Sequence, residues 1–203
     1  MDIKTMKEKS IYEIEEKKSK FIANLIPVSS EKEALDTLNE IRNENKQARH
    51  NCYAFRVMEK QEDGSFILRE RASDDGEPQG TAGSPMLDLL KSKDLVNCIL
   101  VVTRYFGGIL LGTGGLVRAY TDSSIGAIEN AKIEDKVLGL IYKIEVDYSK
   151  QKDIEYIASK NDINIISSDY QEKITYILSS NEENLKKIED ISEVEIIEKN
   201  VFI

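Results

Sequence analysis

The sequence contains no tryptophan, one histidine, two cysteines and three prolines among its 203 residues. Two cysteines are too few for a disulfide framework, and Cys52 and Cys98 lie too far apart for the ligand spacing of a zinc site. Both lie in apolar, strand-like runs, so we expect reduced, buried thiols and a cytosolic protein. The scarcity of proline and the modest glycine content argue against a disordered or collagen-like chain.

No apolar stretch is long enough to cross a bilayer. The longest, residues 98–102 and 109–111, fall far short of the roughly 20 residues that a membrane helix requires. Residues 1–10 are polar and charged, so we expect neither a signal peptide nor a membrane partner. Hydrophobic residues make up 40% of the chain and charged residues 32%, which suits a soluble protein with a buried core.

Positive charge is unevenly distributed in this chain, whose net charge is −9. All seven arginines lie between Arg42 and Arg118. Because the guanidinium group is a planar fork of donors, this part of the chain is the better suited to recognise phosphates or carboxylates. Ion pairs at the edge of a core would produce the same clustering. The acidic net charge argues against indiscriminate binding of nucleic acid.

Hydrophobic periodicity predicts an α+β protein with two domains, residues 1–136 and 137–203. In the first, strands are expected at residues 11–15, 20–28, 52–58, 66–71 and 96–103. Helices are expected at residues 34–41, 86–90 and 116–131, the second with Ser84 as its cap. After Lys136 glycine nearly vanishes, and the runs 137–148, 151–160, 163–168, 173–179, 182–189 and 193–202 follow the order βαββαβ. This order is typical of a ferredoxin-like domain, for which we expect a binding or spacing role.

A glycine-rich segment, residues 107–116, joins the apolar run 96–103 to the following helix. Its glycines are Gly107, Gly108, Gly112, Gly114 and Gly115. Positive φ angles and a helix N-terminus would expose backbone amides to an anion, with Arg104 and Arg118 on either side. The segment has neither the Gly-Lys-Ser/Thr of a phosphate loop nor a dinucleotide fingerprint. A tight turn packed against a neighbouring element is the alternative.

An acidic segment, residues 74–83, contains Asp74, Asp75 and Glu77 followed by small residues that include Thr81. Three carboxylates can hold magnesium or act as a general base, or they can form a solvated turn. The small residues indicate close approach to a ligand or to the glycine-rich segment. His50 would point to the same face of a strand as Cys52. Such a pair can be nucleophilic, but a cysteine in an apolar run more often belongs to the core.

Four motifs together resemble the YigZ/IMPACT family: SKFIA at 19–23, RHNCYA at 49–54, DDGEPQGTAG at 74–83, and VTRYFGG from 102 continuing to RAY at 118–120. The resemblance implies a first domain with the two-layer α/β fold of a ribosomal-protein domain and of domain IV of elongation factor G. It implies that the second domain is similar to domain V of that factor. Eukaryotic members regulate translation by competing for the activator of a starvation-responsive kinase, and bacterial members are connected with nucleic acid or the ribosome.

We therefore predict a non-enzymatic protein that regulates translation through RNA, the ribosome or a ribosome-associated partner, without a cofactor or metal. One alternative is a magnesium-dependent phosphoryl-transfer enzyme or hydrolase, with the acidic segment holding the metal and the glycine-rich segment the phosphate. Another is a module that docks a peptide on the two small-residue segments. The candidate binding residues are Arg104, Gly107, Gly108, Gly112, Gly114, Gly115, Arg118, His50, Asp74, Asp75, Glu77 and Thr81.

Overall fold

The computed structural model describes residues 2–203, which divide into two compact units. The first unit contains residues 3–135, and the second contains residues 136–203 together with Asp2. The boundary expected from composition, after residue 136, lies one residue from this division. None of the helices between residues 2 and 203 is both long and apolar enough to cross a membrane.

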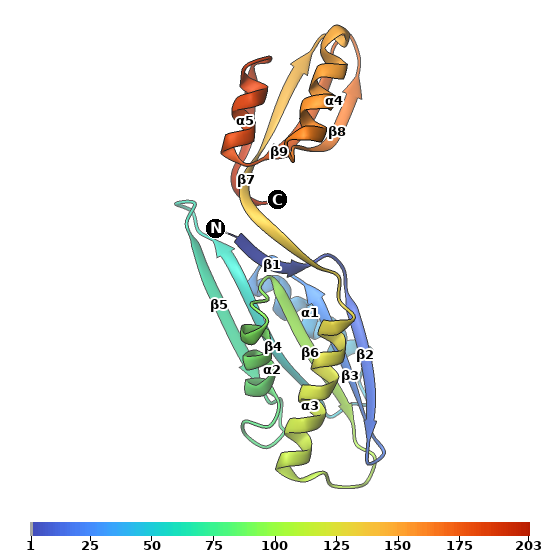
Figure 1. Ribbon diagram of the computed structural model, residues 1–203. Coiled ribbons are helices and arrows are strands. Elements are labelled where there is room, and N and C mark those ends of the chain that lie inside the picture. Colours follow the sequence, from blue (N-terminus) through green and yellow to red (C-terminus); the bar gives the residue numbers. More distant parts are fainter. Residues whose placement is uncertain (1) are drawn as a thin grey trace. The chain divides into compact units, whose positions relative to one another are not determined.

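The first unit is built on an antiparallel sheet with the strand order β2-β3-β6-β4-β5 (Figure 1). Its strands are β2 (Ser10–Glu16), β3 (Ser19–Pro27), β4 (His50–Lys60), β5 (Phe66–Ser73) and β6 (Cys98–Tyr105). A further short strand, β1 (Asp2–Met6), was not expected from the sequence, because three of its five residues are charged or polar. β1 is paired with the chain near the start of β7, where the Lys7 amide donates to the Lys132 carbonyl at 3.0 Å.

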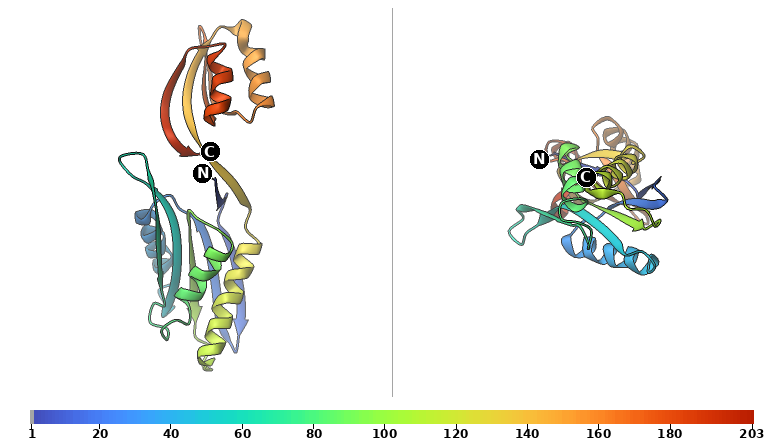
Figure 2. Two further views of the ribbon diagram at one scale, coloured as in Figure 1. Left: turned by 60° about the vertical axis from the view of Figure 1, so that its left-hand side comes forward. Right: turned by 90° about the horizontal axis from the view of Figure 1, so that it is seen from below.

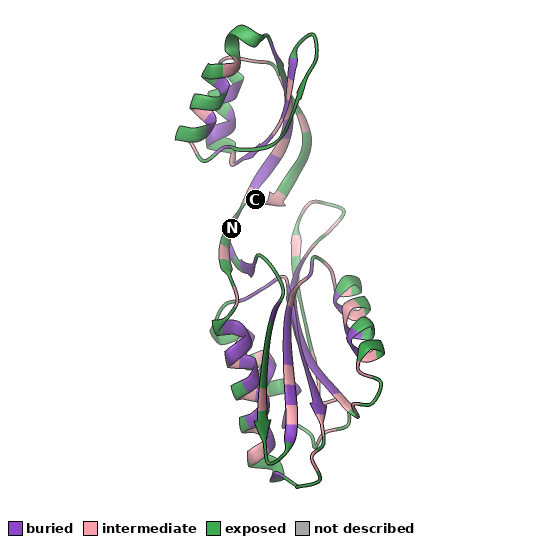
Figure 3. Ribbon diagram, turned by 90° about the vertical axis from the view of Figure 1, so that its right-hand side faces the viewer, coloured by how far each residue is buried: buried purple, intermediate pink, exposed green. Residues whose placement is uncertain are grey.

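Helices cover both faces of this sheet (Figure 3). The helix α1 (Glu31–Glu44) packs on one face, while α2 (Gly83–Ser92) and α3 (Gly112–Glu129) pack on the other. Residues of β4 alternate between the two cores, with Cys52 facing α2 and α3 and Tyr53 facing α1. Because both faces of the central strands are apolar, both require cover. The first unit therefore has three layers, which corrects the two-layer architecture expected from the family resemblance.

The second unit has the expected element order βαββαβ. Its elements are β7 (Ile133–Val146, beginning in the first unit), η1 (Tyr148–Lys150), α4 (Gln151–Lys160), β8 (Asn164–Tyr170), β9 (Ile174–Ser180), α5 (Glu182–Glu189) and β10 (Val194–Phe202). Its sheet has five strands: β10, β7, β9 and β8 lie in that order, and β1 also pairs with β7. Both helices pack on the same core, where Ile154 of α4 and Ile188 of α5 meet the strands.

The register of the first sheet brings the candidate segments to one end of the unit (Figure 2). Lys20 in β3 pairs with Tyr105 in β6, and His50 in β4 pairs with Arg104. The β2–β3 turn, the start of β4 and the β6–α3 connection therefore meet at this end of the sheet. The β5–α2 connection, residues 74–82, lies there as well, since β5 ends beside Tyr53 near the start of β4.

Candidate functional site

The two segments singled out in the sequence are joined by a buried ion pair. Arg104 Nη1 lies 2.7 Å from Glu77 Oε1, and the two side chains are only 7% and 4% exposed. The Tyr120 hydroxyl donates to the same carboxylate oxygen at 2.9 Å. Arg104 was expected to contact phosphates, and this expectation is wrong for the geometry observed. Its charge is committed to a buried carboxylate, because a buried charge is tolerated only when it is paired.

The Arg104 guanidinium also lies between two aromatic rings. Its Cζ is 5.4 Å from the centroid of Phe21 and 5.5 Å from that of Phe106, distances typical of cation–π contacts. Nη2 donates to Ser19 Oγ at 3.4 Å, whereas the buried Nε has no partner among the described residues. Arg104 thus ties the start of β3, the acidic segment and Phe106 together at the end of the sheet.

The Asp74 carboxylate caps the N-terminus of helix α2, although Asp74 lies well before the helix in the sequence. One carboxylate oxygen accepts the amides of Ala82 and Gly83, both at 2.9 Å, and the other accepts the amide of Gly80 at 2.8 Å. Burial alone would raise the pKa of Asp74, but these three donors outweigh it and hold the pKa below its ordinary value of 3.8. The expectation that Ser84 caps this helix is wrong, because Ser84 lies within the first turn.

Asp75 has different partners from its neighbour. Its carboxylate accepts Arg42 Nη2 at 2.6 Å and the Asn51 amide at 2.7 Å. Its carbonyl lies 3.0 Å from Nδ1 of His50, which is therefore part of the support for this loop. Asp74, Asp75 and Glu77 thus serve three separate sets of protein donors. Within residues 2–203 no group of three His, Cys, Asp or Glu side chains is arranged to hold a metal ion.

Two polar side chains near the acidic segment, those of Thr81 and Cys52, donate hydrogen bonds to backbone carbonyls. The Thr81 hydroxyl donates to the Pro78 carbonyl at 2.6 Å and is 3% exposed. The Cys52 thiol donates to the Asp74 carbonyl at 2.9 Å, and burial raises its pKa to about 12. Burial therefore shifts the pKa of Cys52 away from the range of a reactive thiol, which favours a core role over a catalytic pair with His50.

The glycine-rich segment enters helix α3 earlier than the sequence predicted. Helix α3 already begins at Gly112, so Gly114 and Gly115 are helical and Arg118 lies in the second turn rather than the first. Only Gly108 and Gly112 have positive φ, at +86° and +73°, and they are not consecutive. Leu111 lies in the αR region and Gly112 has a positive φ, which is the alternation that an anion nest uses, so the expected nest stays a prediction.

Close packing accounts for one glycine of this segment and not for another. A Cβ on Gly107 would lie 1.9 Å from the Lys18 carbonyl oxygen, so Gly107 is needed where β6 passes the β2–β3 turn. A Cβ on Gly114 would meet nothing within 4 Å. Glycine is disfavoured in a helix relative to alanine by about 1 kcal/mol, and no contact in the described residues compensates for that at Gly114.

Free positive charge at this end belongs to residues that the sequence analysis did not single out, apart from Arg118. Lys17, Lys18, Arg49 and Arg118 are exposed, and none has an ion-pair or side-chain hydrogen-bond partner within residues 2–203. Phe106, which is 50% exposed, follows β6 directly at the same end of the unit. We call Lys17, Lys18, Arg49, Phe106 and Arg118 the loop-end surface.

The β2–β3 turn places its lysines at a conformational cost. Lys17 and Lys18 have φ angles of 47° and 63°, and Glu16 pairs with Ser19 around them. A two-residue turn with both φ positive is best made by Asn-Gly, because a side chain disfavours this conformation by about 1–2 kcal/mol per residue. The fold alone therefore does not explain lysine at these positions.

Comparison with known proteins adds the family. Residues 17–128 match the Impact N-terminal domain. The chain belongs to the IMPACT family. It is 39% identical to an IMPACT family member from Haemophilus influenzae over 87% of this chain and 84% of that protein. It is 39% identical to the IMPACT family member YigZ from Escherichia coli over 76% of this chain and 74% of that protein. The family resemblance inferred from the four sequence motifs is thereby confirmed.

Two solved structures are also similar to the IMPACT family chain. The crystal structure of a hypothetical protein, 33% identical, covers 97% of this chain and 98% of its own, with a TM-score of 0.62. The structure of the two-domain translational regulator Yih1, 28% identical, covers 61% of this chain and 47% of its own. Its TM-score of 0.42 is too low to support an argument about this chain.

Proposed function

We propose that this protein is a non-enzymatic binding protein that regulates translation by attaching to the ribosome, to RNA or to a ribosome-associated partner. Membership of the IMPACT family supports the context, since the family resemblance implies translation regulation. The observation that carries the binding mode is the loop-end surface, where four exposed cations without ion-pair partners lie at the same end of the unit as a half-exposed aromatic ring. Cations of this kind suit the phosphate backbone of an RNA.

The enzymatic alternative receives less support from the geometry. A magnesium-dependent mechanism needs carboxylates directed at one point, whereas Asp74, Asp75 and Glu77 are directed at different donors. Burial raises the pKa of both thiols, Cys52 and Cys98, to about 12, away from the range of a reactive thiol. We therefore retain binding as the proposed activity.

Co-sedimentation with ribosomes and separated subunits, at low and moderate salt, tests the proposal. The informative variant is Lys17→Asn/Lys18→Gly combined with Arg118→Gln, because it removes three charges and also improves the turn. We expect it to unfold at a higher temperature than the parent and to co-sediment at least tenfold less. Arg104 is left unchanged, since its buried position would confuse lost binding with lost stability.

Lys143→Gln, in the second unit, is the matched control for removing a positive charge. It should co-sediment like the parent at both salt concentrations. Absence of the parent protein from the ribosomal fractions at both salts would refute the proposed function. Retained sedimentation of the triple variant would refute the role of the loop-end surface.

A further inference from the structure

The strand β8 forms one edge of the sheet in the second unit (Figure 1). It pairs with β9 on one side, and all seven of its residues, 164–170, are exposed. Between residues 2 and 203 no strand pairs with its other side. Every second residue of an edge strand directs its N–H and C=O away from the neighbouring strand. These backbone groups of β8 are therefore available to an added strand.

The edge strands β2, β5 and β10 are more highly charged than β8. Each has three charged residues: Glu13, Glu15 and Glu16 in β2, Arg69, Glu70 and Arg71 in β5, and Glu195, Glu198 and Lys199 in β10. In β8 the only charged residue is Asp169, and two of the other six residues are isoleucines. Charged side chains discourage pairing between the edges of different proteins, because the approaching strand would have to desolvate them. The contrast indicates that β8 is the edge best suited to accept another strand.

The two faces of β8 differ in polarity. Ile165 pairs with Leu178 and Tyr170 pairs with Ile174, and both partners in β9 are fully buried in the core under the helices. Because directly paired residues share a face of the sheet, Ile165 and Tyr170 lie on the helix-covered face, where they are 37% and 51% exposed. Asp169 lies on the opposite face, since successive residues of a strand alternate. An added strand would therefore place its own apolar side chains beside Ile165 and Tyr170.

The stretch of β8 that can accept a strand is short. A bulge at Ile166 interrupts the pairing with β9, and regular pairing continues from Ser167 to Tyr170. Ile166 is 49% exposed at this bulge. A few main-chain hydrogen bonds and a small apolar contact favour a reversible complex over a permanent one.

Charge indicates which kind of strand fits this edge. Residues 136–203 contain fourteen aspartates and glutamates, nine lysines and no arginine. Asp169 accepts a hydrogen bond from the Gln171 side-chain amide at 2.8 Å and has no ion-pair partner in the part of the chain that the structure describes. A second copy of this chain would bring the same excess of negative charge to the edge. A basic segment would instead bring compensating charge to Asp169.

From these features we propose that β8 binds an extended, basic segment of a partner protein by strand addition. Apolar residues of the segment alternate with lysine or arginine. The apolar residues cover Ile165 and Tyr170, and the basic residues lie on the face of Asp169. This surface shares no residue with the loop-end surface, so the inference goes beyond the proposed function and does not depend on it.

Fluorescence anisotropy with a short labelled peptide of alternating valine and lysine, titrated with the full chain, tests this inference. The same peptide with glutamate in place of lysine should bind about tenfold more weakly. Asp169→Lys should weaken binding of the valine–lysine peptide about fivefold, because it replaces an exposed attraction by a repulsion. The matched control is Glu15→Lys, which reverses a carboxylate on the edge strand β2 and should bind like the parent.

N-methylation of alternate peptide amides tests the main-chain pairing, and thermal unfolding of each variant shows that it is folded. Alternate amides of a strand face opposite sides, so one methylation pattern should abolish binding and the other should keep it within about threefold. Equal binding of both methylated peptides, or parent-like binding by Asp169→Lys, would overturn the inference. Amide exchange at residues 164–170 that slows as the parent protein is concentrated would assign the edge to a second copy and also overturn it. No peptide binding with intact ribosome co-sedimentation would overturn this inference and leave the proposed function in place.

Discussion

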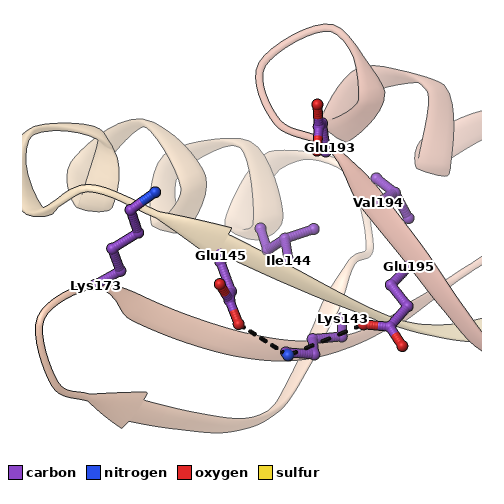
Figure 4. A pocket seen from close by; sticks show the side chains of 7 residues that line it. All are labelled: Lys143, Ile144, Glu145, Lys173, Glu193, Val194 and Glu195. Atoms are coloured by element: carbon purple, nitrogen blue, oxygen red, sulfur yellow. Dashed lines mark ion pairs between the residues drawn. The ribbon is translucent and has the colours of Figure 1, made fainter.

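Ion pairs occur in both units, but their surroundings differ. In the second unit, Lys143 Nζ lies 2.8 Å from Glu145 and 3.9 Å from Glu195 on an open surface (Figure 4). In the first unit, Arg104 and Glu77 form a pair at 2.7 Å that is almost entirely buried. Exposed ion pairs contribute little to stability because water competes for each charge. Removing one partner of a buried pair lowers the free energy of unfolding strongly, because the other charge is left buried without a counter-ion.

This difference explains the distribution of arginine along the chain. The second unit has no arginine and keeps its lysines near the solvent, so its fold depends on the apolar core around Ile154 and Ile188. In the first unit, Arg42 and Arg104 pair with Asp75 and Glu77 and so position the loops at one end of the sheet. Arginine in the first unit is therefore in part structural, and anion recognition is left to residues outside the buried network.

The largest effect is expected from breaking the buried pair. Glu77→Gln leaves the Arg104 charge buried without a counter-ion, and we expect the free energy of unfolding to fall by about 3–5 kcal/mol. Urea denaturation monitored by far-ultraviolet circular dichroism measures this change. The double variant Glu77→Leu/Arg104→Met removes both charges and should recover much of the loss. A decrease of less than about 1 kcal/mol for Glu77→Gln would mean that the buried pair of the first unit contributes as little to stability as an exposed pair of the second unit.

A smaller effect is expected where β6 passes the β2–β3 turn. Gly107→Ala would place a methyl group 1.9 Å from the Lys18 carbonyl oxygen, and backbone on both sides limits the relief. We expect a loss of about 3 kcal/mol in urea denaturation. The matched control is Gly114→Ala, a few residues further on, where nothing lies within 4 Å. That variant should be more stable than the parent by up to about 1 kcal/mol, because alanine is favoured in helices. Destabilisation by Gly114→Ala would contradict the open space described there.

The sequence predicted the elements of the second unit well and those of the first unit less completely. The strands and helices of the second unit repeat with regular spacing, and a single apolar face on each strand is enough to specify a sheet covered on one side. In the first unit the apolar run 96–103 indicated a strand buried on both faces, but the consequence, a helix layer on each side, was not drawn. The strand β1 was missed because local hydrophobicity does not mark a short strand that depends on a distant partner.

The two candidate segments do lie together in the fold, but the roles of individual residues were not predictable, and their part in binding stays a prediction. Glu77 and Arg104 are 27 residues apart, so only the folded sheet shows that they are partners. Glycine is equally evident in the sequence at Gly107 and Gly114, although one is required by backbone contact and the other is not. Lys18 and Arg49 looked ordinary, because an exposed cation carries no local signal until the sheet register brings it to the same end of the unit as the candidate segments. The expected similarity to domains of elongation factor G stays a prediction.

Helix caps offer a third comparison between the units. In the first unit Asp74 caps α2 with a charged group, while in the second unit Asn181 caps α5 with a neutral amide that accepts the Asn184 amide at 2.8 Å. We expect Asp74→Asn to lower the free energy of unfolding by about 2 kcal/mol at neutral pH and Asn181→Ala by about 1 kcal/mol.

Only the first of these losses should depend on pH. The folded-state pKa of Asp74 is depressed, so its contribution is present above the ordinary value of 3.8 and is lost as the pH falls through the folded-state value. The stability difference between the parent and Asp74→Asn should therefore shrink in urea titrations at acidic pH. The difference for Asn181→Ala should stay constant over the same range. A constant difference for both variants would show that the charge of Asp74 does not stabilise the fold.

The smallest effect is expected at the open surface of the second unit. Lys143→Met removes the cation that lies beside Glu145 and Glu195, and we expect urea denaturation to give the parent's midpoint within experimental error. Raising the salt concentration should likewise leave the parent and the variant superimposed, because water already screens these charges. If Lys143→Met instead destabilised the protein as strongly as Glu77→Gln, solvent exposure would not determine how much each ion pair contributes to stability. The buried setting of Arg104 would then no longer account for its structural role, and its contact with Phe106 would become the more important interaction.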